Sequence, residues 1–458
     1  MLSSTNSATL LGVSALPVAV EANSGERGDP RVVLVGLPDA TVKESLDRVH
    51  SSLSNGGFSL PRTRITVNLA PADLRKEGSA FDLPVALCLL ASTKQLGHDL
   101  LKEFLIAGEL GLSGELRYIK GGLSMAVLAK QQKRRGVILP VASAKEASLV
   151  DGIEVYGVSN LSQVVDFLNQ KVALDAIRPT IFSTKTEKDP LYDFNEVKGQ
   201  PKLRRAVEVA VCGGHNLLIV GPPGSGKSMV SKRIPTILPS PSMDEYIEII
   251  KIYSSTGDAS YMANGLNSRP FRAPHHTISD VGLIGGGTIP GAGEISLAHN
   301  GVLFLDELPE FKRSVLEVLR QPLEDGEVTI SRSAGKVTLP SRFMFVASMN
   351  PCPCGYLGDP KNSCRCSIPQ IQKYRSKISG PLLDRIDLHI EAPALAVTEL
   401  QNFKKSESSE VIKRRVEICR EIQRERFSNL KIKTNAFMPD SWIEKACFLS
   451  NENKQVLV

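Results

Sequence analysis

The sequence predicts an α/β protein built around a parallel nucleotide-binding sheet, with a second α/β domain before it. Short apolar runs such as residues 217–220 and 302–305 are bounded by glycine and polar residues, as buried strands are. Segments with helical spacing of apolar residues alternate with these runs. A glycine-rich turn ending in Lys-Ser directly follows the first run, which is typical of a strand that delivers a phosphate-binding loop.

Composition sets broad limits on what the chain does. The 458 residues are 42% hydrophobic and 23% charged, as in ordinary globular proteins, and the formal net charge is +6. This mild basicity is compatible with nucleic acid but equally with a housekeeping protein that has a small lysine and arginine excess. The first 20 residues lack a basic start, and no stretch approaches ~18 apolar residues. We therefore expect a cytoplasmic protein with reduced thiols and no membrane partner.

The N-terminal unit, residues 1–168, shows an α/β pattern of its own. The segment 64–70 alternates apolar and polar residues, as a half-buried strand does. Two further strands and two helices follow from the same reasoning, at residues 31–36, 136–140, 39–55 and 81–93.

The rest of the chain divides into three parts. Residues 169–195 lose periodicity and gain charge and proline, which indicates a linker. Residues 196–393 alternate strands and helices and form the nucleotide-binding domain. Residues 394–458 are helical, with a polar face rich in arginine and glutamate.

The phosphate loop carries the strongest signal in the sequence. It follows a strand, precedes a helix and matches G-x-x-x-x-G-K-[ST], so its backbone N–H groups and the helix start can face phosphate oxygens. Lys227 is expected to bridge the β- and γ-phosphates and Ser228 to ligate Mg²⁺. The loop residues that we expect to bind ATP are Gly221, Pro222, Pro223, Gly224, Ser225, Gly226, Lys227 and Ser228.

A second element supplies acidic groups. Asp306 and Glu307 directly follow the apolar run 302–305, and ligands of parallel sheets lie at the carboxyl ends of the strands. We expect Asp306 to hold Mg²⁺ and Glu307 to polarise the attacking water. Two acidic residues after a strand are common and usually only solvated. The phosphate loop upstream is what makes Mg²⁺ binding and water activation the favoured interpretation.

Two more side chains complete the predicted catalytic set. Asn350 ends the strand-like segment "RFMFVASMN", where an amide can orient water against the γ-phosphate. Arg385 lies between a short helix and a last strand, which suits an arginine finger that enters a neighbouring subunit's site. An intramolecular pair with Asp384 or Asp387 is an equal alternative for Arg385.

These motifs together resemble the AAA+ ATPases, and more narrowly the magnesium-chelatase-like ComM/YifB family. The resemblance covers essentially the whole chain, and its blocks are long and specific. They are "ITVNLAPADLRKEGSAFDLP", "VKGQPKLRRAVEVAVCGGHNLLIVGPPGSGKS", "RPFRAPHHTISDVGLIGGG", "PGAGEISLAHNGVLFLDELPEF", "LRQPLEDGEVTISR" and "NPCPCG".

The resemblance implies both an assembly and an activity. It implies the roles already given to Lys227, Ser228, Asp306, Glu307, Asn350 and Arg385, in a ring that is a homohexamer. It further implies ATP and Mg²⁺ as cofactors and an ATP-driven helicase that migrates DNA branches during natural transformation. Two other function classes compete: a chelatase-type ATPase that remodels a protein partner, and an ATP-dependent protease.

The sequence departs from the resembled pattern in two places. The chain stops before the block that carries the sensor arginine of the helical lid, so we expect either a truncated chain or a shortened lid. The N-terminal unit resembles the Lon protease domain, a ribosomal-S5-domain-2-like fold, but Ala80 and Ala126 stand where that enzyme has its serine and lysine. Ser79 is one position off, so we expect a non-proteolytic scaffold.

Two segments are candidates for DNA contact. Residues 269–293 are too long for a simple connection, and in the resembled branch this insert reaches the central pore with Arg269 and Arg272. Residues 326–340 read as a β-hairpin with Arg332 and Lys336 near its tip. Both could grip a phosphate backbone, and both could equally be structural, as packing insert and surface hairpin. For the adjacent His275 and His276 we favour hydrogen-bonding or nucleotide-proximal roles over metal binding.

Four of the eight cysteines cluster directly after Asn350. They form C-x-C-x9-C-x-C, and four thiolates are the right number and softness for tetrahedral zinc. Free thiols or a redox pair remain alternatives. The predicted ligands are Cys352, Cys354, Cys364 and Cys366.

Overall fold

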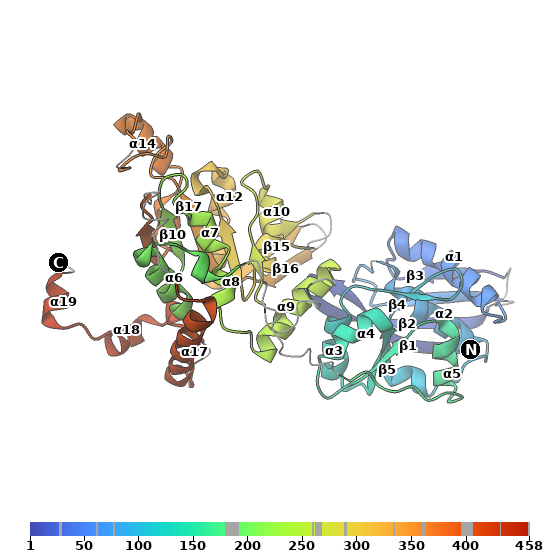
Figure 1. The fold of residues 1–458 in the computed structure, drawn as a ribbon. Coiled ribbons are helices and arrows are strands. Elements are labelled where there is room, and N and C mark those ends of the chain that lie inside the picture. Colours follow the sequence, from blue (N-terminus) through green and yellow to red (C-terminus); the bar gives the residue numbers. More distant parts are fainter. Residues whose placement is uncertain are drawn as a thin grey trace.

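The computed structural model of the chain describes most of its 458 residues. The described ranges are 1–26, 30–60, 63–76, 78–178, 192–258, 261, 268–287, 291–332, 335–359, 362–394, 406–430 and 432–456. Part of the predicted linker, residues 179–191, therefore lies outside the described residues. Figure 1 shows two lobes, the N-terminal domain and the nucleotide-binding domain, with helix α9 between them.

The N-terminal domain is built on a mixed seven-stranded sheet in the order β3-β4-β2-β1-β5-β8-β9. Strands β1, β2 and β4 pair antiparallel, and the other pairings are parallel. The strands are β1 Leu2–Leu11, β2 Ser14–Glu26, β3 Val32–Val35, β4 Arg64–Ala70, β5 Phe104–Ile106, β8 Gly136–Pro140 and β9 Glu154–Val158, with a small separate pair β6 Glu109–Leu110 and β7 Leu116–Arg117.

Helices cover both faces of this sheet. Helices α1, α2 and α5 pack in one apolar cluster, and α3 and α4 pack in another on the opposite face. Neighbouring residues of one strand divide between them, since Leu105 lies in one cluster and Ile106 in the other. The helices are α1 Ala40–Asn55, α2 Asp82–Ser92, α3 Gly122–Gln131, α4 Val141–Ala147 and α5 Leu161–Leu168, with 3-10 turns η1 Ser79–Phe81 and η2 Leu100–Lys102.

The long β1–β2 hairpin was not predicted from the sequence. Hydroxyl residues fill the buried side of β1, where the strand pattern calls for apolar ones. Ser3 Oγ donates to the carbonyl of Cys88 at 2.8 Å, and Thr5 Oγ1 donates to that of Leu101 at 3.2 Å. Because buried hydroxyls are tolerated once they are hydrogen-bonded, these residues form a strand that hydrophobic periodicity does not reveal.

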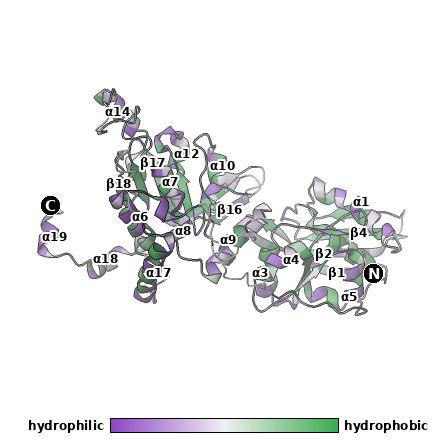
Figure 2. Ribbon diagram, in the orientation of Figure 1, coloured by the Kyte–Doolittle hydropathy of each residue, from purple (hydrophilic) through white to green (hydrophobic). Residues whose placement is uncertain are grey.

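The nucleotide-binding domain holds a five-stranded, all-parallel sheet in the order β11-β14-β17-β10-β18. Its strands are β11 Phe271–Arg272, β14 Val302–Leu305, β17 Met344–Met349, β10 Leu217–Val220 and β18 Leu388–Glu391. Both faces are covered, because alternate residues of β14 lie in two different apolar clusters. Figure 2 shows hydrophobic colouring concentrated on the strands of both domains. The α/β fold class with its N-terminal mixed-sheet domain is confirmed.

Short helices connect and cover these strands. They are α6 Pro201–Gly213, α7 Lys227–Ser231, α8 Ile234–Ile237, α10 Asp280–Ile284, α11 Glu294–Leu297, α12 Arg313–Glu317, α13 Arg320–Asp325, α14 Ile368–Arg375 and α15 Gly380–Leu383, with 3-10 turns η3 Phe194–Glu196 and η5 Leu308–Glu310. The predicted hairpin is present as β15 Glu327–Arg332 paired with β16 Gly335–Pro340, and a further small pair joins β12 Gly285–Gly286 to β13 Gly291–Ala292.

Helix α9, Met243–Thr256, belongs to the nucleotide-binding domain in sequence but packs on the N-terminal domain. Its Tyr246 and Ile249 lie in the same apolar cluster as Met125 of α3. Ser254 Oγ donates to buried Glu146 at 2.7 Å and accepts the N–H of Gly121 at 3.0 Å. The two domains are therefore joined through α9 as well as through the chain between them.

The C-terminal residues are helical, as predicted. They form α17 Ser409–Arg426, η6 Asn435–Phe437, α18 Asp440–Ala446 and α19 Asn451–Val456. Helix α17 packs on α6 and α8, while α18 and α19 extend away from the domain in Figure 1. In the part of the chain that is described, every helix is too short or too polar to cross a bilayer.

Candidate functional site

The phosphate loop connects β10 to α7 at the carboxyl edge of the parallel sheet. Gly224 and Gly226 have φ values of 76° and 86°, which residues with a Cβ rarely adopt. The two glycines let the backbone turn tightly before Lys227 begins the helix. Gly221 N donates to the carbonyl of Met349 at 3.1 Å, so the start of the loop is fastened to the neighbouring strand β17.

The Lys227 ammonium is held inside this loop. It donates to the carbonyls of Gly221 at 2.7 Å and Pro222 at 2.9 Å, and to Asn350 Oδ1 at 3.2 Å. Burial lowers the pKa of Lys227, while the carboxylates of Asp306 and Glu307 oppose that shift. The ammonium of Lys227 thus lies near the amide of Asn350 and the carboxylates of Asp306 and Glu307.

Two hydroxyls flank the Asp306 carboxylate at the end of β14. Ser228 Oγ donates to Asp306 Oδ2 at 2.5 Å, and Ser348 Oγ donates to Oδ1. Hydroxyl and carboxylate oxygens are ligands that Mg²⁺ accepts together with phosphate oxygens. The predicted Mg²⁺ ligands Ser228 and Asp306 thus lie side by side on two different elements. Ser348 was missed by sequence reasoning, although its place two residues before Asn350 on the same strand was a usable signal.

Glu307 turns away from the sheet directly after Asp306. Its φ of 54° lies in the left-handed region, and its N–H donates to Asp306 Oδ1 at 3.1 Å. The side chain is 58% exposed, and His276 Nδ1 lies 3.7 Å from its Oε2. Strained backbone of this kind is frequent at functional sites, which agrees with the role predicted for Glu307. The ring centroids of His276 and His275 lie 4.0 Å apart, so both histidines are close to Glu307.

Arg385 lies at the opposite, amino edge of the same sheet. It stands three residues before β18, whose Leu388 pairs in register with Leu217, the first residue of β10. The phosphate loop begins at Gly221, after the four residues of β10, which make about 13 Å of strand. Arg385 is therefore separated from the phosphate loop of its own chain by the length of the strand.

The partners of Arg385 differ from both predicted ones. Its guanidinium donates to the carbonyl of Pro381 at 2.8 Å and forms an ion pair with Glu324. Within the described residues, neither Asp384 nor Asp387 pairs with it. The Asp387 carboxylate instead accepts the N–H of Asn216 at 2.7 Å, and His215 Nδ1 lies 3.5 Å away. The predicted alternative of a pair with Asp384 or Asp387 is thus corrected.

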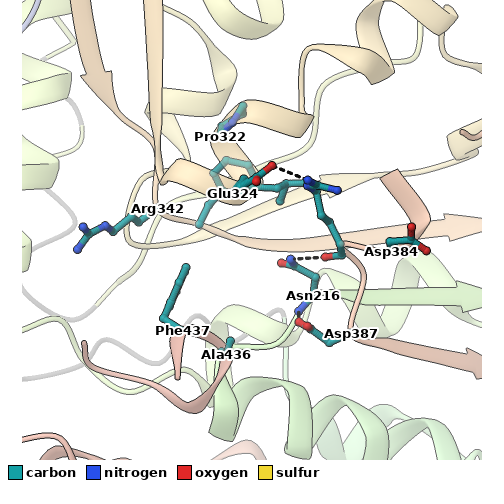
Figure 3. A pocket seen from close by; sticks show the side chains of 12 residues that line it. Asn216, Pro322, Glu324, Arg342, Asp384, Asp387, Ala436 and Phe437 are labelled. Carbon is teal, nitrogen blue, oxygen red and sulfur yellow. Dashed lines mark hydrogen bonds and ion pairs between the residues drawn. The ribbon is translucent and has the colours of Figure 1, made fainter. Parts of the chain in front are cut away.

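A pocket of about 260 Å³ lies around this arginine. Figure 3 shows Glu324 and Arg342 on one side of it, and Asn216 with Asp387 on another. The side chain of Asn216 joins two segments that line or border the pocket. It donates to the carbonyl of Arg385 at 2.8 Å and accepts the N–H of Phe345 at 2.9 Å. Sequence reasoning missed this role of Asn216, and its position just before β10 was the only signal.

The residues predicted to contact DNA are placed in two different ways. Arg269 is 12% exposed and donates to Glu245 at 2.7 Å, and although burial opposes the shift, Arg269 lowers the pKa of Glu245 to about 2. Arg272 pairs with Glu294 at 2.6 Å. Both guanidinium groups therefore pair with carboxylates of their own chain, and the DNA contact of Arg269 and Arg272 stays a prediction.

The hairpin places its residues on two faces. Val328, Ile330, Val337 and Leu339 pack against Val13 and Ile252. Lys336, paired in register with Ser331, lies on the exposed face. The side chain of Arg332 lies outside the described residues.

The four clustered cysteines come together in space. Their sulfurs all lie within 4.8 Å of one another, and Cys352 is fully buried. Such a set is compatible with zinc.

The positions that resemble the Lon catalytic pair do not form a nucleophile with a base. Ala80 and Ala126 offer only methyl groups, and the neighbouring Ser79 hydroxyl donates to the Glu109 carboxylate. Lys76 is fully buried and donates to the carbonyl of Pro71.

Comparison with known proteins places this geometry in a family. Residues 193–400 match the model of magnesium chelatase, subunit ChlI, residues 20–143 match that of subunit ChlI of Mg-chelatase, and residues 406–458 match that of the ChlI C-terminal part. Among curated proteins, the competence protein ComM of Haemophilus influenzae is 45% identical over 97% of this chain and 86% of its own length. YifB of Escherichia coli is 42% identical over 99% of this chain and 87% of its own length. Magnesium-chelatase subunit ChlI of Guillardia theta is 25% identical over 38% of this chain and 55% of its own length.

Proposed function

The chain belongs to the magnesium-chelatase ChlI-like family of AAA+ ATPases, close to ComM and YifB, and from this premise we propose that it is an ATP-driven ring motor that acts on DNA. The ring is proposed to be a homohexamer. Its work on DNA is proposed to be branch migration, with helicase activity, in homologous recombination or natural transformation.

The separation of Arg385 from the phosphate loop is the observation that carries the ring proposal. The carboxyl edge holds Lys227, Asp306 and Glu307 together, whereas Arg385 stands a strand length away. An arginine so placed can stabilise phosphoryl charge only in the site of another copy. Copies arranged head to tail would join one chain's carboxyl edge to the next chain's amino edge, and such an interface forms a ring when the rotation between copies closes.

The residues of the carboxyl edge divide the hydrolysis among them. ATP and Mg²⁺ are the proposed cofactors, and bound Mg²⁺ would neutralise charge that develops on the phosphates. Ser228 and Asp306 would hold this ion, and Lys227 would hold the β- and γ-phosphates. Glu307 would accept a proton from the attacking water, which Asn350 orients. A zinc ion at the four-cysteine cluster is the third proposed cofactor.

The exposed position of Lys336 supports DNA as the molecule on which the motor acts. It lies on the exposed face of a hairpin whose other face is anchored in an apolar cluster, so it is presented on a rigid element. An exposed lysine at such a site neutralises phosphates without reading bases, as a motor on arbitrary sequences requires. Arg332 precedes the tip of the same hairpin. The relative ComM is named a competence protein, which agrees with the proposed role in natural transformation.

Stimulation of ATP hydrolysis by branched DNA tests this proposal. Forked or four-way DNA should raise the hydrolysis rate, and Lys336→Ala and Arg332→Ala should lose that stimulation. Lys202→Ala removes an exposed lysine of α6 from the same domain, and it should keep the stimulation.

The alternative function is a chelatase-type ATPase that remodels a protein partner. It is favoured by the match of the whole nucleotide-binding domain to the ChlI model. Hydrolysis that no DNA structure stimulates would contradict the DNA proposal and favour this alternative.

A further inference from the structure

We infer that the four-cysteine cluster is a zinc clamp that holds Asn350 and the phosphate loop in their catalytic arrangement. The inference rests on the proposed ATPase function, because it assigns to this cluster a part in building the nucleotide site. The cluster itself lies outside the phosphate loop and the acidic pair.

The sulfur positions have the size of a zinc site. Cys352 Sγ lies 3.4 Å from Cys354 Sγ and 3.7 Å from Cys364 Sγ, and the sulfurs of Cys354 and Cys364 are 3.6 Å apart. Cys366 completes a group whose members all lie within 4.8 Å of one another. Four thiolates about 2.3 Å from a zinc ion have sulfur–sulfur edges of about 3.8 Å. A disulfide would need two of these sulfurs at about 2.05 Å.

The ligand chemistry agrees with a soft thiophilic ion such as zinc. An all-thiolate set with four members excludes hard cations such as Mg²⁺ and Ca²⁺, which take oxygen ligands. Among the described residues, the group contains no fifth ligand side chain, which is typical of a closed structural zinc site.

The first cysteine pair is directly tied to the nucleotide site. Cys352 follows Asn350 by two residues, and Asn350 Oδ1 accepts from Lys227 Nζ at 3.2 Å. The turn that follows closes where Gly355 N donates to the carbonyl of Cys352 at 3.0 Å. A Cβ on Gly355 would lie 2.7 Å from Pro223 Cδ, so this turn rests on the phosphate loop with room only for hydrogen.

The second cysteine pair leads into a helix that is anchored elsewhere. Helix α14 starts one residue after Ser367, which caps it with Gln370. Tyr374 of α14 is buried in the apolar core of the domain, and Arg375 Nε donates to the carbonyl of Pro351 at 3.2 Å. Among the residues described between the first cysteine and Ser367, none belongs to a helix or strand. A metal ion joining both pairs would therefore fix the Asn350 segment between α14 and the phosphate loop.

Zinc content tests the site itself. The full chain, purified without chelator, should contain one zinc per chain by mass spectrometry of metals. A thiol-binding mercurial should release this zinc, and the double variant Cys364→Ser/Cys366→Ser should contain none. A native protein without zinc, or with these cysteines in a disulfide, would overturn the inference.

A pair of glycine variants tests the clamp without touching a ligand. Gly355→Ala keeps all four thiolates but places a methyl group against Pro223, so it should retain zinc. It should lower the rate of ATP hydrolysis by about tenfold or more, because a displacement of about 1 Å can cost about 100-fold. Gly358→Ala is the matched control, since Gly358 has a similar positive φ of 78° and nothing within 4 Å of an added Cβ. It should retain both zinc and hydrolysis.

Binding of a fluorescent ATP analogue separates the clamp from the proposed function. The zinc-free cysteine variant and Gly355→Ala should bind the analogue at least several-fold more weakly than Gly358→Ala. Equal binding and hydrolysis in all of these proteins would overturn the clamp. A wild-type protein that holds zinc and binds the analogue but is not stimulated by DNA would refute the DNA motor alone.

Discussion

The two edges of the parallel sheet in the nucleotide-binding domain are built in opposite ways. At the carboxyl edge, polar groups satisfy one another: Lys227 has three acceptors, and Asp306 receives two hydroxyls. At the amino edge, Arg385 lies in an open pocket and is paired with Glu324, which is 62% exposed.

Under the proposed function, the carboxyl edge would bind nucleotide with groups of one chain, and the arginine would come from the amino edge of another copy. An exposed ion pair contributes about 0 to 1 kcal/mol, so the Glu324 contact can be exchanged for a stronger one at little cost. The amino edge is therefore suited to act on another molecule.

The largest effect is expected at the amino edge. Arg385→Ala should lower the rate of ATP hydrolysis about 10³-fold, as loss of an arginine finger does, while the affinity for nucleotide stays unchanged. Steady-state hydrolysis and binding of a fluorescent ATP analogue measure the two quantities.

Arg342→Ala is the matched control, since Arg342 is exposed and lines the same pocket. Mixing Arg385→Ala protein with Lys227→Ala protein should restore part of the hydrolysis, because mixed rings contain interfaces with both intact edges. Loss of activity in Arg342→Ala but not in Arg385→Ala would show that the wrong arginine has been assigned.

The second effect is expected at the carboxyl edge and should fall on binding. Lys227→Ala removes charge-assisted contacts to phosphate that contribute about 3 kcal/mol, so nucleotide affinity should fall roughly 100-fold. Isothermal titration with an ATP analogue checks this. Lys232→Ala removes an exposed lysine just after the same helix and should bind normally. Unchanged affinity in Lys227→Ala would show that Lys227 at the carboxyl edge does not contribute to nucleotide binding.

A smaller effect is expected from Ser348, which contacts the carboxylate of Asp306, the proposed Mg²⁺ ligand. Ser348→Ala removes one hydroxyl from the carboxylate, and loss of such an outer partner costs about tenfold in metal affinity. The Mg²⁺ concentration for half-maximal hydrolysis should rise accordingly, with near-normal rates at saturating Mg²⁺. A lower maximal rate with an unshifted Mg²⁺ dependence would instead give Ser348 a part in the chemistry.

The smallest effect lies outside both edges, at the contact of α9 with the N-terminal domain. Burial raises the pKa of Glu146 to about 7, although the Ser254 hydroxyl favours its charged form. The folded protein then binds more protons than the unfolded one above the ordinary glutamate pKa. Stability should therefore fall by about 1 kcal/mol between pH 6 and pH 7 and level off above pH 7.

Urea unfolding at these pH values checks this dependence. Glu146→Gln keeps an acceptor for Ser254 and should remove the slope. Nucleotide affinity at the carboxyl edge should not show this pH dependence. A slope that persists in the variant would assign the titration to another group.

Local pattern was enough to predict the parts of the site that one segment builds. The phosphate loop, the acidic pair after residues 302–305, the hairpin and the strand 64–70 each lie within a short stretch. Their geometry follows from glycine, periodicity and strand polarity, which are properties of neighbouring residues. The same information, read with the long matching blocks, was enough to predict the family.

Only the tertiary structure decided which side chains meet. The sequence offered Asp384 and Asp387 as partners of Arg385, yet Glu324, some sixty residues away, forms the ion pair. Arg269 is turned inward onto Glu245, and Gly355 rests on Pro223, more than one hundred residues before it. These contacts depend on how the elements pack, because burial and close approach are set by all surrounding atoms at once. Sequence therefore determined the family and the local elements of this protein, and packing determined which side chains contact one another.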